Sequence, residues 1–361
     1  MTFLKNILSA LGGGLLLSET ALAAGTLTMG VPEAREIPVQ VTASGPALLF
    51  SDSPERVFDT GVLYRDTVEG PVRIFVHHLN GTKRDLKLAV IVRPEGGEPV
   101  TITLGQVGIS EPSSNYAKAA KQSQKSYFTP RTEQKATINR FQFRELLSNS
   151  SDQEAGIILK PDELVTGMVD FTASAKATVS VLMCEKADLA VAFNRIAPIL
   201  PMDTHPLRGT YQHADLTYTV QDLLNFDKED CFYIRMAKND DSYFLQGIDA
   251  TTGVATINNG NYGVVYKLRY RIKDKEHYAL RINPSGGYFA GYALYINKDG
   301  KKLVPLPKGE DNAMGKTGTE MYTFATGGGG DASVNEETFI WSPPGAANLP
   351  IRFYWQHINN K

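Results

Sequence analysis

Residues 264–273 read VVYKLRYRIK, and apolar side chains alternate with basic ones along this stretch. An alternation with period two is typical of a β-strand that buries one face and exposes the other. Five apolar residues share one face, and the other face carries four cations: Lys267, Arg269, Arg271 and Lys273. The stretch therefore predicts a strand in a sandwich wall, with a row of positive charge on its outer face.

The same alternation recurs along the chain, at 72–76, 86–92, 100–104, 179–183 and 351–355. Turn residues separate these short runs, and long helical patterns are nearly absent. The Asp-Gly pair in Lys298-Asp299-Gly300 follows an apolar run and suits a type I′ turn, so it predicts a β-hairpin. The pattern predicts an all-β fold made of jelly-roll-like sandwiches.

A weak internal repeat suggests how the sandwiches are arranged. At an offset of 190 residues, PEGG at 94–97 matches PSGG at 284–287, and alternating runs precede both. We predict two tandem β-sandwich domains of similar topology, at 24–190 and 209–361, joined by a Pro-containing connector at 191–208. The alternative is two unrelated strand-rich segments that share a common turn.

The first 23 residues have the features of a secretory signal peptide. Lys5 precedes an apolar run at 7–17, and Ala21-Leu22-Ala23 fits the small-x-small cleavage pattern. A buried N-terminal helix is the alternative. We predict cleavage after Ala23 and an exported protein, whether extracellular, surface-bound or periplasmic. No later apolar run approaches the ~20 residues of a membrane span, so the mature chain is expected to lack a transmembrane segment.

Composition excludes some classes of function. The 361 residues include 37 Lys and Arg against 39 Asp and Glu, a formal charge of −2, so no basic excess favours specific nucleic-acid binding. An oxidising compartment would permit a disulfide between Cys184 and Cys231. Two buried free thiols are the alternative, since free cysteine behaves as a small hydrophobe.

The sequence lacks the common catalytic motifs, including GxSxG, the phosphate-binding loop and HExxH. His77 and His78 are adjacent in a predicted strand and should point to opposite faces, so we expect no metal site and no cofactor. Asp52 and Glu55, in the run SDSPE at 51–55, are interpreted as caps of a turn. Asp240 and Asp241 offer another pair of carboxylates, but among 39 acids such pairs are weak evidence of catalysis.

Three groups of residues are candidates for ligand binding. The cations of 264–273 would make a shallow strip for an acidic polymer, unless acids on neighbouring strands pair with them. The segment 116–140 is rich in Lys and Arg, and a short helix there would place three lysines on one face: Lys118, Lys121 and Lys125. Tyr288 and Tyr292 would share a face, either as a platform for sugar rings or as sandwich core.

Several stretches together resemble one protein family: FSDSPE at 50–55, GVLY at 61–64, VRIFVHHLN at 72–80 and PLRGT at 206–210. They are similar to secreted bacterial proteins of unknown function that are often labelled copper amine oxidase-like. The resemblance covers most of the mature chain. The label derives from a small module of which this sequence shows no copy, so the resemblance implies neither copper nor amine oxidation here.

These observations favour an exported, non-catalytic binding or structural protein of the cell envelope. Its expected partner is an acidic cell-wall or extracellular glycan, or a surface protein. The alternative is a polysaccharide-active enzyme, a hydrolase or lyase, on a jelly-roll scaffold. A concave cleft with paired carboxylates would favour the enzyme, and an exposed basic strip on a flat sheet would favour the binder.

Overall fold

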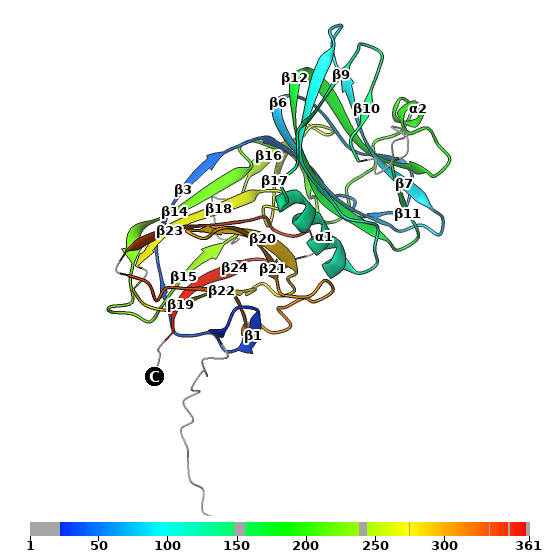
Figure 1. Ribbon diagram of the computed structural model, residues 1–361. Coiled ribbons are helices and arrows are strands. Elements are labelled where there is room, and N and C mark those ends of the chain that lie inside the picture. The colour runs from blue at the N-terminus through cyan, green and yellow to red at the C-terminus, as the bar shows by residue number, and fades with distance from the viewer. Residues whose placement is uncertain are drawn as a thin grey trace, which may run out of the picture.

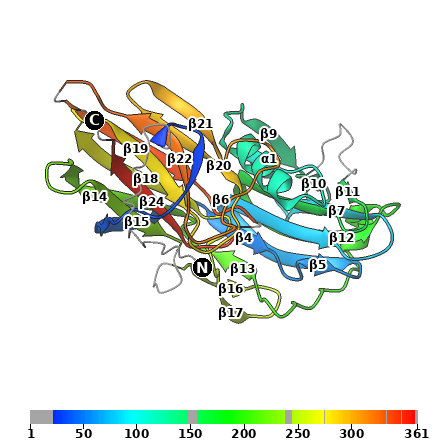
Figure 2. The ribbon, with the colours of Figure 1, turned by 90° about the horizontal axis from the view of Figure 1, so that it is seen from below.

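The computed structural model describes residues 22–147, 156–237, 244–273, 275–331, 333–345 and 347–358. Strands make up 55% of the chain and helices 6%, so the predicted all-β class is confirmed. The predicted signal peptide lies almost entirely outside the described residues. Two lobes are visible in Figures 1 and 2, one built on a 12-stranded sheet and the other on two six-stranded sheets.

The two six-stranded sheets form a sandwich. The first has the strand order β1 (Thr26–Met29), β22 (Glu320–Gly327), β19 (Tyr278–Asn283), β24 (Ile351–His357), β15 (Cys231–Met236) and β2 (Arg35–Glu36). The second has the order β21 (Gly300–Leu306), β20 (Gly291–Asn297), β23 (Val334–Trp341), β18 (Val265–Lys273), β14 (Asp215–Leu224) and β3 (Val39–Ser44). The predicted hairpin at 298–300 joins β20 to β21 and is confirmed.

The third sheet follows the path β10 (Arg144–Glu145), β7 (Leu86–Pro94), β12 (Leu164–Glu185), β6 (Gly61–Asn80), β4 (Ala47–Ser51), β13 (Arg208–Tyr211), β16 (Gln246–Asp249) and β17 (Val254–Ile257). Four more strands pair off this path: β5 (Arg56–Val57), β8 (Val100–Ile109), β9 (Gln134–Ile138) and β11 (Ile157–Leu159). One half of β12 pairs with β8 and the other with β7, and its register against β6 shifts between Ala173 and Ala177. Such an irregularity bends a strand. The bend lets the two halves of this sheet face each other and pack around one apolar core.

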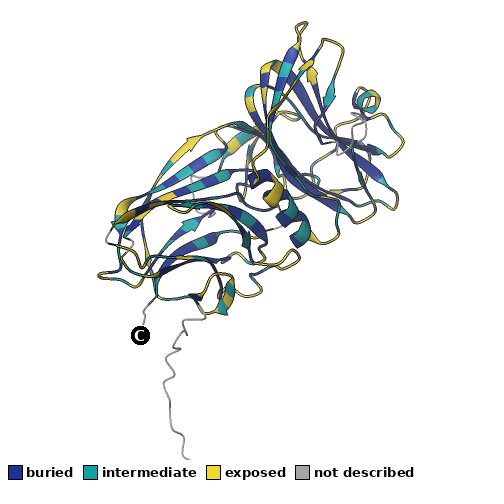
Figure 3. Cartoon of the chain, in the orientation of Figure 1, coloured by how far each residue is buried: buried dark blue, intermediate teal, exposed yellow. Residues whose placement is uncertain are grey.

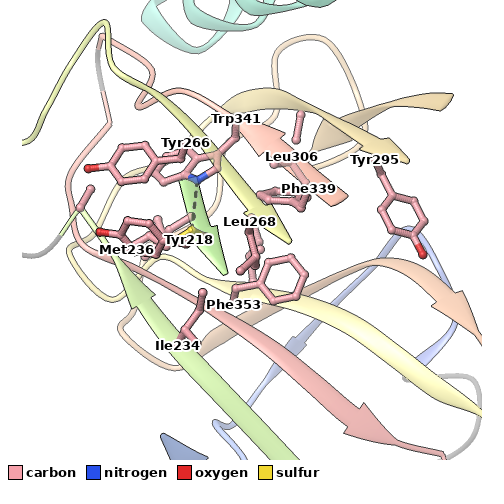
Figure 4. Close-up of a cluster of buried hydrophobic side chains, with 14 of the residues drawn as sticks. Tyr218, Ile234, Met236, Tyr266, Leu268, Tyr295, Leu306, Phe339, Trp341 and Phe353 are labelled. Atoms are coloured by element: carbon pink, nitrogen blue, oxygen red, sulfur yellow. Dashed lines mark hydrogen bonds between the residues drawn. The ribbon is translucent and has the colours of Figure 1, made fainter. Parts of the chain in front are cut away.

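Aromatic side chains fill the space between the two six-stranded sheets (Figure 4). The apolar face of 264–272 is fully buried there, as its alternation predicts. Tyr266 stacks on Trp341 with ring centroids 5.2 Å apart, and the Trp341 indole N–H donates to Sδ of Met236 at 3.3 Å. Large rings that bury this much apolar surface supply much of the stability of a sandwich core.

Strand pairing crosses the predicted domain boundaries. Strands β1, β2 and β3 belong to the predicted first domain, yet they pair with strands of the C-terminal half. Conversely, β13 of the predicted second domain pairs with β4. The matched turns at 94–97 and 284–287 follow β7 and β19, but β7 and β8 share β12 as partner, whereas β19 and β20 lie in different sheets. The tandem arrangement stays a prediction.

In the part of the chain that the structure describes, two helices accompany the strands, α1 (Tyr116–Phe128) and α2 (Ala190–Asn194). The side chain of Asn115 caps α1 by accepting from the Lys118 N–H at 3.1 Å. Helix α1 contacts β8 and β12 on one side and β20 on the other, so it lies where the two lobes meet (Figure 1). Among the described residues, no helix has the length and apolar character needed to span a membrane.

The two cysteines do not pair. Both are buried free thiols, and the possible disulfide between Cys184 and Cys231 is therefore not formed. Cys184 lies on β12 in the 12-stranded sheet, and Cys231 lies on β15 in the sandwich, each within a different apolar cluster. Burial raises the pKa of Cys184 to about 11 and that of Cys231 to about 12.

We expect both thiols to react slowly with a disulfide reagent in the folded protein. The thiolate is the reactive form, and its fraction at about pH 8 falls roughly 200-fold when the pKa rises from about 8.5 to about 11. Thiol titration with Ellman's reagent, with and without concentrated guanidinium chloride, measures the difference. Rapid reaction of either cysteine without denaturant would show that its burial is not as described.

Candidate functional site

The four cations of β18 lie on the outer face of the sandwich. We call Lys267, Arg269, Arg271 and Lys273 the cationic strip. The two arginines are exposed and the two lysines are half-buried, while the residues between them point into the core. The exposed and buried segments alternate along the strands of this sheet in Figure 3. Successive residues on one strand face lie about 6.6 Å apart, so the strip is about 20 Å long.

One end of the cationic strip is partly neutralised. Nζ of Lys273 lies 3.4 Å from a carboxylate oxygen of Asp227, in an exposed ion pair. Nη2 of Arg271 donates to the backbone carbonyl of Gln221 at 3.1 Å. Arg271 also faces Glu336 across the β18–β23 pair. As far as the structure describes the chain, neighbouring acids therefore offset the positive charge of the strip at Arg271 and Lys273 only.

The other end carries two unpaired charges. Within the described part of the chain, Lys267 and Arg269 make no ion pair and no side-chain hydrogen bond. On the adjacent strands, Thr217 and Ile340 lie beside Lys267, and Thr219 and Thr338 lie beside Arg269. Thr42 and Gln40 follow on β3, one strand further away. Neighbouring strands are about 4.8 Å apart, so the two cations and the polar side chains of β14 and β3 form one polar surface, which the half-buried Ile340 borders on the β23 side. Such a surface offers donors to carboxylates and hydroxyls together.

The short helix predicted within 116–140 is formed, as α1, but its three lysines do not share one exposed face. Lys121 is only 2% exposed, and its ammonium donates to the carbonyls of Pro307 at 2.7 Å and Gly309 at 2.6 Å. The assignment of Lys121 to a binding surface is therefore wrong, because the loop after β21 covers it. Lys118 is half-buried and Lys125 is exposed on either side of this contact.

The two candidate tyrosines lie apart from the cationic strip. Tyr288 precedes β20 and is 38% exposed, and its carbonyl accepts from the Asn348 N–H at 2.7 Å. Tyr292 is half-buried at the start of β20, where its N–H donates to Oε1 of Gln124 on α1 at 2.7 Å. Because β23 lies between β20 and β18, the structure does not bring these rings into the strip.

The turn at 51–55 is stabilised by Asp203 and not, as predicted, by the side chain of Asp52. Asp203 forms its polar contacts, with Oδ1 accepting from Ser53 Oγ and Oδ2 from the Glu55 N–H, both at 2.9 Å. Asp52 is only 6% exposed, and its Oδ1 has no hydrogen-bond partner. The interpretation of Asp52 as a turn cap is therefore wrong, since Asp203, about 150 positions along the chain, supplies the cap instead. Asp240 and Asp241 lie outside the described residues.

Comparisons with known proteins add little to this site. No protein-family model matches the chain, and no curated protein matches it. The CUB1-EGF-CUB2 domain of human MASP-1/3 aligns over 79% of this chain and 99% of its own, at 10% identity and a TM-score of 0.16. The CBM22-1-CBM22-2 tandem domain of Paenibacillus barcinonensis Xyn10C aligns over 89% and 92%, at 8% identity and a TM-score of 0.15. Similarity this weak carries no argument about fold or function.

Proposed function

We propose that this protein binds an acidic polysaccharide of the cell envelope along the cationic strip. The observation that carries the proposal is the unpaired, solvent-facing pair Lys267 and Arg269, set among hydroxyl and amide side chains on a sheet face. Like charges placed side by side on a strand repel unless something negative offsets them. A carboxylate-bearing chain lying along the strip would offset them.

The chemistry of the surface favours a uronate polymer. Arginine offers bidentate contacts to a carboxylate, and lysine offers a mobile point charge. The threonine and glutamine side chains beside them suit the hydroxyl groups of sugar rings, which both donate and accept hydrogen bonds. The predicted export of the chain would place this surface where such polymers occur. The proposal assigns no chemical reaction to the strip.

The test compares binding of polygalacturonate by the wild-type protein and by the double variant Lys267→Gln and Arg269→Gln. An exposed cation near an anionic surface contributes about 1 kcal/mol. Losing two should therefore weaken binding roughly 30-fold, as measured by biolayer interferometry at low salt. Neutral glucan serves as the ligand control.

A variant with the same change in net charge controls for non-specific attraction. Lys83 and Lys176 are exposed and belong to the 12-stranded lobe, so Lys83→Gln with Lys176→Gln should leave the affinity within about twofold. If both double variants lost affinity equally, the loss would be explained by the change in net charge and not by the strip. Unchanged affinity after all four strip cations are replaced by Gln would exclude the strip as the binding surface.

A further inference from the structure

Three side chains that can bind a metal ion meet on the 12-stranded sheet. One carboxylate oxygen each of Asp52 and Glu55 and one ring nitrogen of His77 all lie within 4.8 Å of one another. The backbone explains the meeting. Strands β4 and β6 are parallel, and Ser51 is in register with Val76. Continuing that register by one residue places Asp52 beside His77, and the turn that follows brings Glu55 back toward them.

The buried members of this cluster lack partners. Asp52 is 6% exposed and His77 is 4% exposed, yet Oδ1 of Asp52 and Nδ1 of His77 have no hydrogen-bond partner. A buried polar atom without a partner is costly, by about 1–3 kcal/mol, and native proteins seldom leave one without a role. Two residues of one cluster each carry such an atom, which indicates that something absent from the polypeptide completes the cluster.

The charge of the cluster indicates a cation. The carboxylate of Asp52 is buried close to that of Glu55, and the same turn holds the carboxylate of Asp203, which accepts from the Glu55 N–H. Carboxylates gathered this closely repel one another unless a positive charge is supplied. A ring nitrogen of His77 offers a lone pair to a metal at the same place.

The surrounding residues hold the donors in place. His78 bridges the turn, with one ring nitrogen 2.9 Å from Ser51 Oγ and the other 2.9 Å from the carbonyl of Pro54. A side chain at Gly345 would collide with the ring of His77, so only glycine fits beside it. Glu55 is exposed, and the cluster therefore opens to solvent on its side.

We propose that Asp52, Glu55 and His77 bind one divalent transition-metal ion such as Zn²⁺. Imidazole suits zinc, and carboxylates complete such sites, whereas Ca²⁺ and Mg²⁺ prefer oxygen alone. Zinc with bonds of about 2.0–2.1 Å holds tetrahedral ligands about 3.3 Å apart. Closure of the site therefore needs movements of up to about 1.5 Å from the separations of up to 4.8 Å, to which the exposed Glu55 can contribute. Solvent would provide the fourth ligand.

The test is calorimetric titration of Zn²⁺ into the full chain, purified without a polyhistidine tag and freed of metal by a chelator. We expect one ion per chain and at least a tenfold loss of affinity in Asp52→Asn and in His77→Gln. His213 is exposed with a φ of 58°, a conformation that asparagine tolerates, so His213→Asn is the matched control and should bind as the wild type does.

A second readout separates binding from misfolding. Asp52→Asn keeps the volume of the side chain and removes a buried charge, so the metal-free variant should unfold at or above the wild-type temperature. Zn²⁺ should raise the unfolding temperature of the wild type and not that of the variant. If Asp52→Asn fails to fold, the exposed Glu55→Gln replaces it in the titration. The proposal is overturned if the wild type binds no stoichiometric Zn²⁺, if it binds Ca²⁺ instead, or if affinity is unchanged in the folded variants.

Discussion

Replacing Arg73 with methionine should destabilise the protein by about 3–5 kcal/mol. Arg73 is only 3% exposed on β6, and its guanidinium makes two bonds to Asp170 on β12, at 2.8 and 3.0 Å. Nη1 reaches the other lobe, where it donates to Oδ1 of Asp215 on β14 at 2.8 Å. Tyr127 of α1 joins the cluster by donating to Asp170 at 2.8 Å. Removing the cation leaves two carboxylates facing each other at the junction of the lobes.

Urea unfolding followed by tryptophan fluorescence measures this effect. Both tryptophans, Trp341 and Trp355, lie in the core of the sandwich, so the signal reports on the lobe that Arg73 contacts from outside. Arg84→Met is the matched control, because its pair with Glu185 is exposed and contributes about 0–1 kcal/mol. Equal destabilisation by the two variants, or a loss below about 1 kcal/mol at Arg73, would show that the buried network does not couple the lobes.

Replacing Arg208 with methionine should destabilise the protein by a similar amount, about 3–5 kcal/mol. Arg208 and Asp249 form an ion pair at 2.9 Å in which each side chain is 1% exposed. Nη1 of Arg208 also donates to the carbonyls of Leu63 at 3.0 Å and Leu200 at 2.9 Å. The residue thereby ties the connector, β6 and β13 together. Its loss leaves the buried carboxylate of Asp249 without its counter-ion and removes the donor from two buried carbonyls.

The pair also predicts a pH dependence. Burial opposes ionisation of Asp249, but hydrogen bonds from Thr251 and Arg208 outweigh it and hold its pKa below the usual value. The stabilisation is therefore fully present above about pH 4 and is lost as the pH falls through the lower, folded-state pKa. The free energy of unfolding of the wild type minus that of Arg208→Met/Asp249→Leu should therefore stay constant from pH 7 to about pH 4 and fall at lower pH, as denaturation curves at each pH measure. A rise in the stability of the wild type relative to the variant on acidification would contradict the prediction.

Local patterns predicted much of the fold. The alternation at 264–273, the hairpin at 298–300 and the helix around the alanines of 117–120 are all formed, because each depends on residues close together in the chain. The pairing of β1–β3 with the C-terminal half was not predictable in this way. The residues of 26–44 do not indicate which sheet edge those strands join, because that pairing depends on packing against residues far along the chain.

In the candidate sites, too, local features were predictable from the sequence and long-range contacts were not. The outward direction of the strip cations follows from period two, so the sequence predicted it correctly. The burial of Lys121 depends on carbonyls at 307 and 309, which lie far along the chain and carry no side-chain signal. The meeting of Asp52, Glu55 and His77 depends on parallel pairing of β4 and β6, and the adjacent histidines favoured the expectation of no metal site.

The salt dependence of polygalacturonate binding tests the central proposal most directly. If Lys267 and Arg269 contact carboxylates, affinity should fall at least tenfold between about 50 and 200 mM salt, because counterions are released and exposed charges are screened. The double variant Lys267→Gln and Arg269→Gln should bind weakly and respond little to salt. Absence of wild-type binding at low salt, or binding that salt does not weaken, would contradict the proposal.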